Sequence, residues 1–349
     1  MNQESLFCDL FPEDDVAEDE RHPILDIPLN ESRPLILNWG AGVDSTAMAC
    51  GLRERDIIPD LVIFSDTGGE KQRTYDWVRR FPAIMHSWGF PEIVVVRYRP
   101  VRATYDNLFD NCWQNQTLPS LAFGYGKCSL KFKGEVMDGW IRGISRGPNK
   151  KAPWAKYAEA AAAGVKPTKL IGYDAGPKDS RRKVAHHEDD NWFYRYPLRE
   201  WGWDREACEA VIRRHGLTVP PKSSCTFCPA MKPHELIDLF DTEPDKFLEA
   251  MQLEARALPG LEKVEGLWRK TRKGDGRSGS WLLWAESEGI VHVTRAPVTR
   301  AFKPDSKKEF DREVRTYDDV VAIDLLEVRA DVRERWANEE TDDYGCAAF

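Results

Sequence analysis

The fold is decided by the stretch Leu35-Ile36-Leu37-Asn38-Trp39-Gly40-Ala41-Gly42-Val43-Asp44-Ser45-Thr46-Ala47-Met48. It opens with a short apolar run typical of a buried strand, passes through a glycine turn and enters a helix. Gly40 and Gly42 allow a sharp turn and a close approach to a ligand, because no Cβ intrudes. The first amides of a helix lack intrahelical partners and lie at its positive end, so they favour an anion. The stretch therefore predicts a phosphate-binding loop, and the alternative is an ordinary turn capped by Asp44 or Ser45.

The loop is similar to one known class of phosphate-binding loop. It lacks the Lys-Ser/Thr pair of a Walker A motif and the glycine spacing of a dinucleotide fingerprint. It resembles the pyrophosphate loop of the PP-loop ATP pyrophosphatases, Ser-Gly-Gly-x-Asp-Ser, in Gly42, Asp44 and Ser45. Gly40 and Ala41 stand where that family has Ser and Gly, and both replacements keep the loop small. The resemblance implies catalytic roles for Asp44 and Ser45, and it implies that ATP is bound by Gly40, Ala41, Gly42, Val43, Asp44, Ser45 and Thr46.

Length and composition indicate a globular chain with one main domain and an appended part. The chain has 349 residues, which is more than usually fold around a single hydrophobic core. Hydrophobic residues make up 42% of the chain and charged residues 31%, as in globular proteins. We expect an acidic flexible tail at 1–32, a nucleotide-binding domain with the cysteine site at 33–240, a helical or mixed extension at 241–340 and a flexible tail at 341–349. No apolar run is long enough to cross a membrane and no signal-peptide pattern occurs, so we expect a cytoplasmic protein without membrane contact.

Short apolar runs alternate with helical patterns after the loop. The runs lie at 35–38, 61–64, 93–96 and 169–173, and a fifth strand or extended segment is expected at 193–198. Apolar strands that alternate with helices predict an α/β fold, in which a parallel twisted sheet carries helices on both faces. Ligands of such sheets bind at the carboxyl ends of the strands, so the loop at Gly40 and the turn at Asp66 are expected to share one crevice.

Two further strand ends carry residues suited to a nucleotide. Asp66-Thr67-Gly68 follows the second strand, and its carboxylate suits a ribose hydroxyl or Mg²⁺; the alternative is a turn residue that caps the next helix. Gly172 ends the fourth strand, and the polar loop after it supplies the phosphate-binding candidates Ser180, Arg181, Arg182 and Lys183. Guanidinium groups bind phosphate oxygens in pairs, so Arg181 and Arg182 are candidates for stabilising charge during catalysis. The alternative is a solvated charge run.

The cysteines indicate a metal or redox site. The chain has eight cysteines. In a cytosolic protein, two cysteines placed close together in the sequence indicate metal binding or redox chemistry rather than a disulfide. Cys225 and Cys228 form a C-x-x-C pair, and Cys128 is a third candidate ligand. Three thiolates suit a 4Fe–4S cluster with one open iron, whereas a closed zinc site needs a fourth ligand such as Cys208 or a histidine. A redox-active dithiol and reduced structural thiols are the remaining alternatives.

Four motifs resemble the phosphoadenosine phosphosulfate (PAPS) reductase branch of the PP-loop proteins. In chain order they are Gly40–Ser45, Asp66–Glu70 with Thr74-Tyr75, Ile171-Gly172 with Asp179, Ser180 and Arg182, and Tyr196–Trp201 with Asp204. The resemblance covers about residues 33–235 and implies the adenine nucleotide alpha hydrolase-like fold. Related proteins also occur in mobile-element and type IV-B CRISPR-associated loci, a setting that would suit a divergent member.

Two departures from that family bear on the reaction. Assimilatory PAPS reductases end in Glu-Cys-Gly-Ile/Leu-His, whereas Cys346 here lies in Tyr344-Gly345-Cys346-Ala347-Ala348. Cluster-bearing relatives usually have Cys-Cys ahead of the C-x-x-C pair, whereas Lys127-Cys128 stands in that place here. One expected cluster ligand is therefore missing or replaced.

Three functions follow from these motifs. The first is an ATP pyrophosphatase-type enzyme that binds ATP with Mg²⁺, transfers AMP to an acceptor and releases pyrophosphate, with the cysteines linked to sulfur transfer. The second is a PAPS or adenylylsulfate reductase with Cys346 as nucleophile. The third is a nucleotide-binding accessory subunit of a nucleic-acid-modifying or defence complex. The acceptor is unknown, with nucleic acid and a partner protein as candidates, and we expect a homo-oligomer.

The region after 242 gives weaker signals. A helix is expected at 243–258, a short strand-like piece at 291–293 and a charged, partly helical region at 305–340. The basic and aromatic stretch 268–284 contains Trp281 and Trp284, which could stack on nucleic acid; the alternative is a hairpin with a solvated turn. The net charge of −8 argues against a protein coated in nucleic acid but allows a local basic groove.

Overall fold

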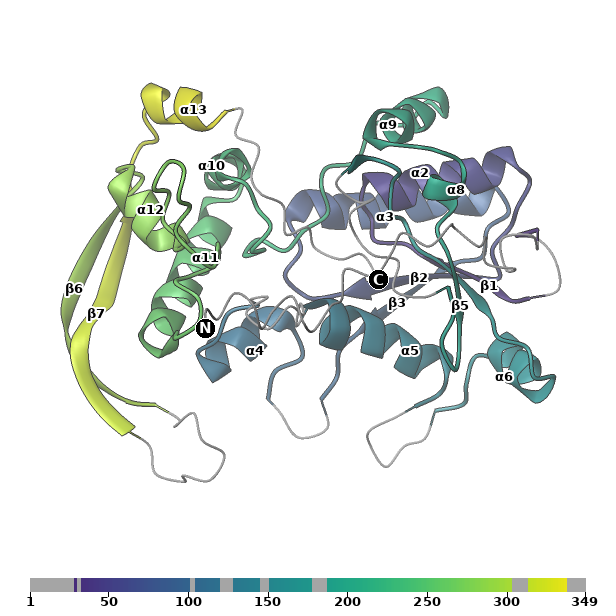
Figure 1. The fold of residues 1–349 in the computed structure, drawn as a ribbon, viewed down its shortest axis with the longest axis horizontal. Helices are drawn as coiled ribbons and strands as arrows, with labels where there is room; N and C mark the ends of the chain where they lie inside the picture. Colours follow the sequence, from purple (N-terminus) through teal and green to yellow (C-terminus); the bar gives the residue numbers. More distant parts are fainter. Residues whose placement is uncertain are drawn as a thin grey trace, which may run out of the picture.

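The computed structural model describes residues 28–29, 33–100, 104–119, 128–144, 151–177, 187–302 and 313–337. Its centre is a five-stranded parallel sheet in the order β3-β2-β1-β4-β5 (Figure 1). The strands are β1 (Leu35–Asn38), β2 (Leu61–Asp66), β3 (Ile93–Arg97), β4 (Thr168–Leu170) and β5 (Phe193–Arg195). The predicted α/β fold with a parallel sheet is confirmed.

β1 lies at the centre of the sheet because both of its edges are paired. Leu37 pairs with Val62 of β2 on one side and with Leu170 of β4 on the other. Every residue of β1 and β2 is buried, as expected for parallel strands covered on both faces. The chain builds β2 and β3 on one side of β1 and then returns to build β4 and β5 on the other. The carboxyl edge beside β1 is therefore the reversal point at which open α/β sheets bind ligands.

Helices cover both faces of the sheet (Figure 1). One face packs against α2 (Val43–Glu54), α3 (Gln72–Ser87), α8 (Pro197–Glu200) and α9 (Arg205–Arg214). The other face packs against α5 (Glu135–Ile141) and α6 (Ala155–Ala162). Asp204 caps α9 by accepting a hydrogen bond from the Ala207 amide at 2.9 Å. In the described parts of the chain, no helix has both the length and the apolar character that a membrane crossing needs.

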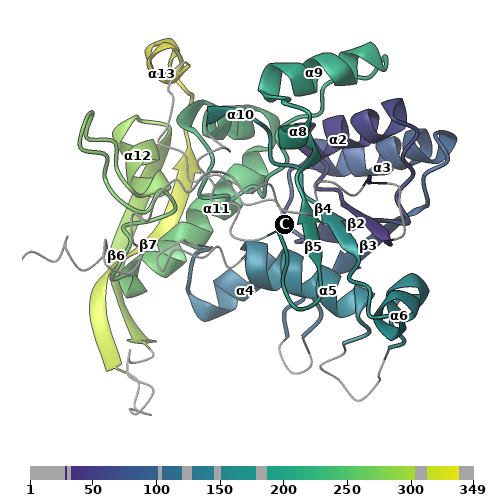
Figure 2. The same ribbon diagram turned by 45° about the vertical axis from the view of Figure 1, so that its right-hand side comes forward.

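A second core lies beside the sheet domain (Figure 2). Its C-terminal elements are α10 (Pro233–Thr242), α11 (Pro244–Ala257), η3 (Leu258–Gly260), α12 (Trp281–Ser287), β6 (Val291–Phe302), β7 (Glu313–Leu325) and α13 (Ala330–Trp336). Two earlier segments, α4 (Leu108–Asn115) and the π-helix η2 (Cys128–Gly134), contribute to the same cluster of apolar side chains. Residues on both sides of position 240 thus build one core.

A buried carboxylate fixes the connection between α11 and α12. Glu254 is fully buried and accepts hydrogen bonds from the amides of Leu267 at 2.6 Å, Trp281 at 3.0 Å and Leu282 at 2.6 Å. The Ser280 hydroxyl donates a further bond at 2.7 Å. Burial raises the pKa of Glu254, and these hydrogen bonds act in the opposite direction. The carboxylate therefore satisfies amides at the N-terminus of α12 that have no intrahelical partner.

Two expected strands are present but differ in length from their predictions, and one expected helical region is largely a strand. The fifth strand ends at Arg195, because Pro197 begins the helix α8, a position where a missing N–H costs nothing. The strand-like piece at 291–293 is the start of β6, and much of the region expected to be partly helical is β7. The two strands form a long antiparallel ribbon, in which Val291 pairs with Leu325. Only α13 confirms the helical expectation there.

Candidate functional site

The predicted phosphate-binding loop joins the carboxyl end of β1 to α2, which begins after the N-cap residue Gly42. Ser45 Oγ accepts a hydrogen bond from the Gly40 amide at 3.1 Å and donates one to the Gly42 carbonyl at 3.3 Å. Ala41 is fully buried and has a φ of 56°, in the left-handed region. An L-residue other than glycine pays about 1–2 kcal/mol for this conformation. The loop therefore keeps its turn although alanine replaces the glycine of the similar family.

The turn leaves a row of backbone amides at the N-terminus of α2. Within the described residues, the amides of Ala41, Gly42, Val43 and Ser45 have no hydrogen-bond acceptor. Gly172, just after β4, packs against this turn, and a Cβ at Gly172 would lie 3.2 Å from the Ser45 amide nitrogen. Glycine keeps that space open for a ligand oxygen. The loop and Gly172 therefore form a cradle of donors suited to a phosphate group.

Two other side chains of the loop hold α2 to its neighbours. Asp44 Oδ1 lies 3.0 Å from an Arg205 guanidinium nitrogen at the start of α9. Thr46 is fully buried, and its Oγ1 accepts a hydrogen bond from Trp77 Nε1 at 3.2 Å. Thr46 thus contributes its backbone to the loop, while its side chain packs against α3. The predicted catalytic role of Asp44 stays a prediction.

Residues 223–226, here named the strap, cross the loop and join it to the end of β2. On the loop side, Ser223 Oγ donates a hydrogen bond to the Gly40 carbonyl at 2.6 Å. On the side of β2, the Lys71 amide donates to the Ser224 carbonyl at 3.2 Å, and the Thr226 amide donates to the Gly69 carbonyl at 2.8 Å. Between these two bonds, Cys225 forms an antiparallel bridge with Glu70. The C-x-x-C pair therefore begins on a segment that lies against the phosphate-binding loop. No pattern in the sequence indicates this pairing.

Asp66 organises the turn that follows β2. Its Oδ1 accepts hydrogen bonds from the Gly68 amide at 2.7 Å and from the Tyr75 hydroxyl at 2.9 Å. Its Oδ2 accepts a bond from Arg97 Nε of β3 at 3.1 Å. Burial, reinforced by Asp66, raises the pKa of Tyr75, so the phenol stays protonated and donates. Gly68 has a φ of +75°, which glycine adopts without strain. These contacts favour a structural role for Asp66, and its binding of ribose or Mg²⁺ stays a prediction.

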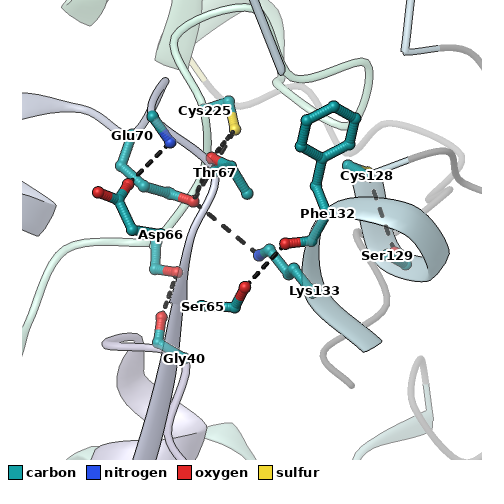
Figure 3. Close-up of polar contacts among 12 residues, drawn as sticks. Gly40, Ser65, Asp66, Thr67, Glu70, Cys128, Ser129, Phe132, Lys133 and Cys225 are labelled. Atoms are coloured by element: carbon teal, nitrogen blue, oxygen red, sulfur yellow. Dashed lines mark hydrogen bonds and ion pairs between the residues drawn. The ribbon is translucent and has the colours of Figure 1, made fainter. Parts of the chain in front are cut away.

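A buried polar cluster lies beside this turn (Figure 3). Thr67 Oγ1 donates to Glu70 Oε1 at 3.2 Å and lies 3.0 Å from Cys225 Sγ. Cys225 Sγ is 3.8 Å and Lys133 Nζ is 4.0 Å from the same Glu70 oxygen. One carboxylate oxygen therefore gathers a hydroxyl, a thiol and an ammonium group. Sequence reasoning singled out neither Glu70 nor Lys133 for this cluster, although Glu70 directly follows the predicted Asp66 motif.

The three cysteines predicted as metal ligands share the second core without converging. Cys128 opens η2, and its Sγ lies 3.9 Å from Ser129 Oγ, whereas Cys225 faces Thr67. Figure 3 shows the ring of Phe132 between Cys128 and Cys225. Among the described residues, no three His, Cys, Asp or Glu side chains come together as metal ligands. In this arrangement the three cysteines do not fit a 4Fe–4S cluster or a zinc ion, and the chemistry proposed below relies on neither.

Several predicted residues lie outside the described residues. They are Ser180, Arg181, Arg182, Lys183 and Cys346. Their assignments to phosphate binding, to charge stabilisation and, for Cys346, to nucleophilic attack stay predictions.

The tryptophans of the basic stretch are core residues. Trp281 and Trp284 are buried on α12, and Trp268 packs against both rings. Stacking of Trp281 and Trp284 on nucleic acid is therefore ruled out, because their faces are covered by protein. The preceding residues form a tight turn in which Arg272 and Asp275 make an ion pair.

Comparison of the chain with protein-family models and with curated proteins gives no match.

Proposed function

We propose that this protein is a PP-loop ATP-binding enzyme of the ATP pyrophosphatase type, which adenylates an acceptor. The observation that supports this most is the row of amides at the N-terminus of α2, with Gly172 leaving space in front of the Ser45 amide. The row lies at the carboxyl edge of the sheet beside the strand-order reversal. Membership of the PAPS reductase-like branch is part of the proposal and is supported by the four motifs in order.

The loop would act by holding phosphate and stabilising charge. The amides of Gly42, Val43 and Ser45 would bind the β- and γ-phosphates of ATP. The Ser45 hydroxyl would add a further donor by turning its proton from the Gly42 carbonyl to the phosphate. A nucleophile of the acceptor would attack the α-phosphorus, forming the acceptor–phosphorus bond as the bond to the β-phosphate oxygen breaks. The electron pair stays on pyrophosphate, whose charge the amides stabilise. Arg181 and Arg182 would assist, and Mg²⁺ arriving with ATP would neutralise phosphate charge.

A sulfonucleotide reductase is the second candidate. One observation favours it: the Cys225 thiol lies 3.0 Å from Thr67 Oγ1 at the carboxyl end of β2, beside the loop. An accessory subunit that binds nucleotide without turnover, in a nucleic-acid-modifying or defence complex, is the third. For each of them a cytoplasmic homo-oligomer is part of the proposal.

Calorimetric titration with ATP, adenylylsulfate and PAPS, each with Mg²⁺, separates these proposals. Tighter binding of ATP supports the pyrophosphatase type, and tighter binding of a sulfonucleotide moves the assignment to the reductase. Tight ATP binding without release of pyrophosphate, whichever acceptor class is added, favours the accessory subunit. Absence of binding for all three nucleotides would contradict the proposal.

A further inference from the structure

Lys71 is a buried lysine at the start of α3. The residue is 3% exposed and is the N-cap of α3. No hydrogen bond or ion pair joins its Nζ to any residue in the described part of the chain. Burial lowers the pKa of Lys71, since a low-dielectric environment disfavours the charged form. An ammonium group held in this way is costly unless something neutralises it.

The carboxylates near Lys71 are engaged by other donors. Glu235 Oε2 accepts hydrogen bonds from Lys222 Nζ and from the Lys232 amide, both at 2.8 Å. Asp238 forms an ion pair with Arg73. Glu235 and Asp238 therefore act on Lys71 only through their fields, without direct contact.

Further positive and hydrogen-bonding groups surround Lys71. Burial is the main cause that lowers the pKa of His234; the Glu235 carboxylate acts against it, and the charges of Lys232, Lys222 and Lys71 add to it. His234 Nδ1 is buried and has no hydrogen-bond partner among the residues that the structure describes. His234 lies in the first turn of the ten-residue helix α10, whose positive end adds to the same field. Three lysines thus share the surroundings of one carboxylate, Glu235, beside an imidazole nitrogen that has no partner in the described part of the chain.

We propose that Lys71 and His234, beside the positive end of α10, bind a tetrahedral oxyanion, either sulfate or a phosphoryl group. Lys71 Nζ would supply the charge, and a neutral His234 with its proton on Nδ1 would donate a hydrogen bond. Lys222 and Lys232, which are more exposed, would lie around the anion. This site differs from the cradle at Ser45, and the strap lies between them: Ser223 bonds to the loop, and Ser224 bonds to the Lys71 amide.

The test is thermal unfolding of a Gly172→Val protein in sodium sulfate, against sodium chloride at equal ionic strength. The Gly172→Val change fills the space before the Ser45 amide, so the loop no longer contributes to sulfate binding. Sulfate is expected to raise the Tm. Once sulfate saturates the site, the Tm should increase linearly with the logarithm of the sulfate concentration. Adding Lys71→Met is expected to remove that rise, whereas Lys246→Met, at an exposed lysine paired with Glu249, is expected to keep it. An equal rise with and without Lys71 would overturn the proposal.

The same variants give a second readout in chloride alone. With no oxyanion present, Lys71→Met is expected to be more stable than its parent, because it removes an uncompensated buried charge. A less stable Lys71→Met protein would show that the fold already satisfies Lys71, and would overturn the proposal. Glycerol 3-phosphate in place of sulfate tells whether the site also accepts a phosphoryl group carried on a larger ligand.

If Lys71→Met does not fold, ¹⁵N-histidine NMR of the Gly172→Val protein replaces it. Sulfate is expected to shift the His234 ring nitrogens along a saturable curve, with the signals assigned through His234→Gln. Unchanged His234 signals at sulfate concentrations that raise the Tm would overturn the proposal.

Discussion

Gly172 and Ser45 meet where the end of β4 touches the first turn of α2, and a Cβ on Gly172 would lie 3.2 Å from the Ser45 amide nitrogen. The two residues come from different strand ends, so the sheet order brings them together. Because Gly172 has no side chain, a ligand atom has room to reach the Ser45 amide, which has no acceptor among the described residues. The proposed function depends on this space.

Substitution of Gly172 is therefore expected to weaken nucleotide binding. Gly172→Ala places a methyl group before the Ser45 amide and should raise the Kd for ATP about tenfold or more, because a hydrogen bond to a charged group is lost. Gly274→Ala is the matched control, since a Cβ there meets no atom within 4 Å. Calorimetric titration measures both, and equal affinities for ATP would show that Gly172 does not border the phosphate site.

Ala41 is expected to tolerate glycine better than a β-branched residue. Its φ of 56° suits glycine and strains valine. Ala41→Val should lower the free energy of unfolding by about 1–3 kcal/mol, whereas Ala41→Gly should change it by less than about 1 kcal/mol. Urea unfolding measures both, with Ala163→Val at the exposed end of α6 as the control. An Ala41→Val protein as stable as wild type would refute the left-handed turn.

Removal of the Glu254 charge is expected to destabilise the second core. Its carboxylate accepts bonds from three amides and a hydroxyl, and a glutamine amide would turn an NH₂ group toward some of these donors. Glu254→Gln should cost about 2–4 kcal/mol in the free energy of unfolding. The exposed Glu249→Gln should cost little. Chemical denaturation compares the two, and similar values would argue against a capping role for Glu254.

Glu235 is expected to contribute stability that is lost in acid. Burial raises its pKa, but Lys222, the Lys232 amide and Lys71 together outweigh burial, so the folded pKa lies below the ordinary value. When the pH falls below the pKa that Glu235 has in the unfolded chain, the unfolded chain binds a proton and the folded protein does not, so stability decreases. The contribution of Glu235 is lost completely once the pH has also passed below its pKa in the folded protein. The difference in unfolding free energy between wild type and Glu235→Gln should thus be largest near neutral pH and shrink below about pH 4. A difference independent of pH would contradict this assignment.

The sheet could be predicted from the sequence because its strands are continuous apolar runs with glycine or polar residues at their ends. β1, β2 and β3 fall within a residue or two of their expected places. The loop at 40–46 was also predictable, since a strand, a glycine turn and a helix start lie within one short stretch. Asp204 was predictable as a cap for the same local reason.

The rest depends on contacts between distant segments. The strap pairs with residues 69–71 through single bridges, which leave no periodic pattern in the sequence. The position of Cys128 relative to Cys225 follows from how η2 packs, and spacing along the chain could not give it. β7 was missed because charged residues interrupt it, although the β-branched Val320, Val321 and Ile323 were an available signal.

The central claim is that the amides at the start of α2 bind the phosphates of ATP. Its most direct test is calorimetric titration of wild type with ATP and with AMP, repeated with Ser45→Ala and, as a control, with Ser87→Ala at the exposed end of α3. ATP is expected to bind more tightly than AMP. Ser45→Ala is expected to weaken ATP binding, and Ser87→Ala is expected to leave it unchanged. Equal affinities for ATP and AMP, or ATP binding unaffected by Ser45→Ala, would contradict it.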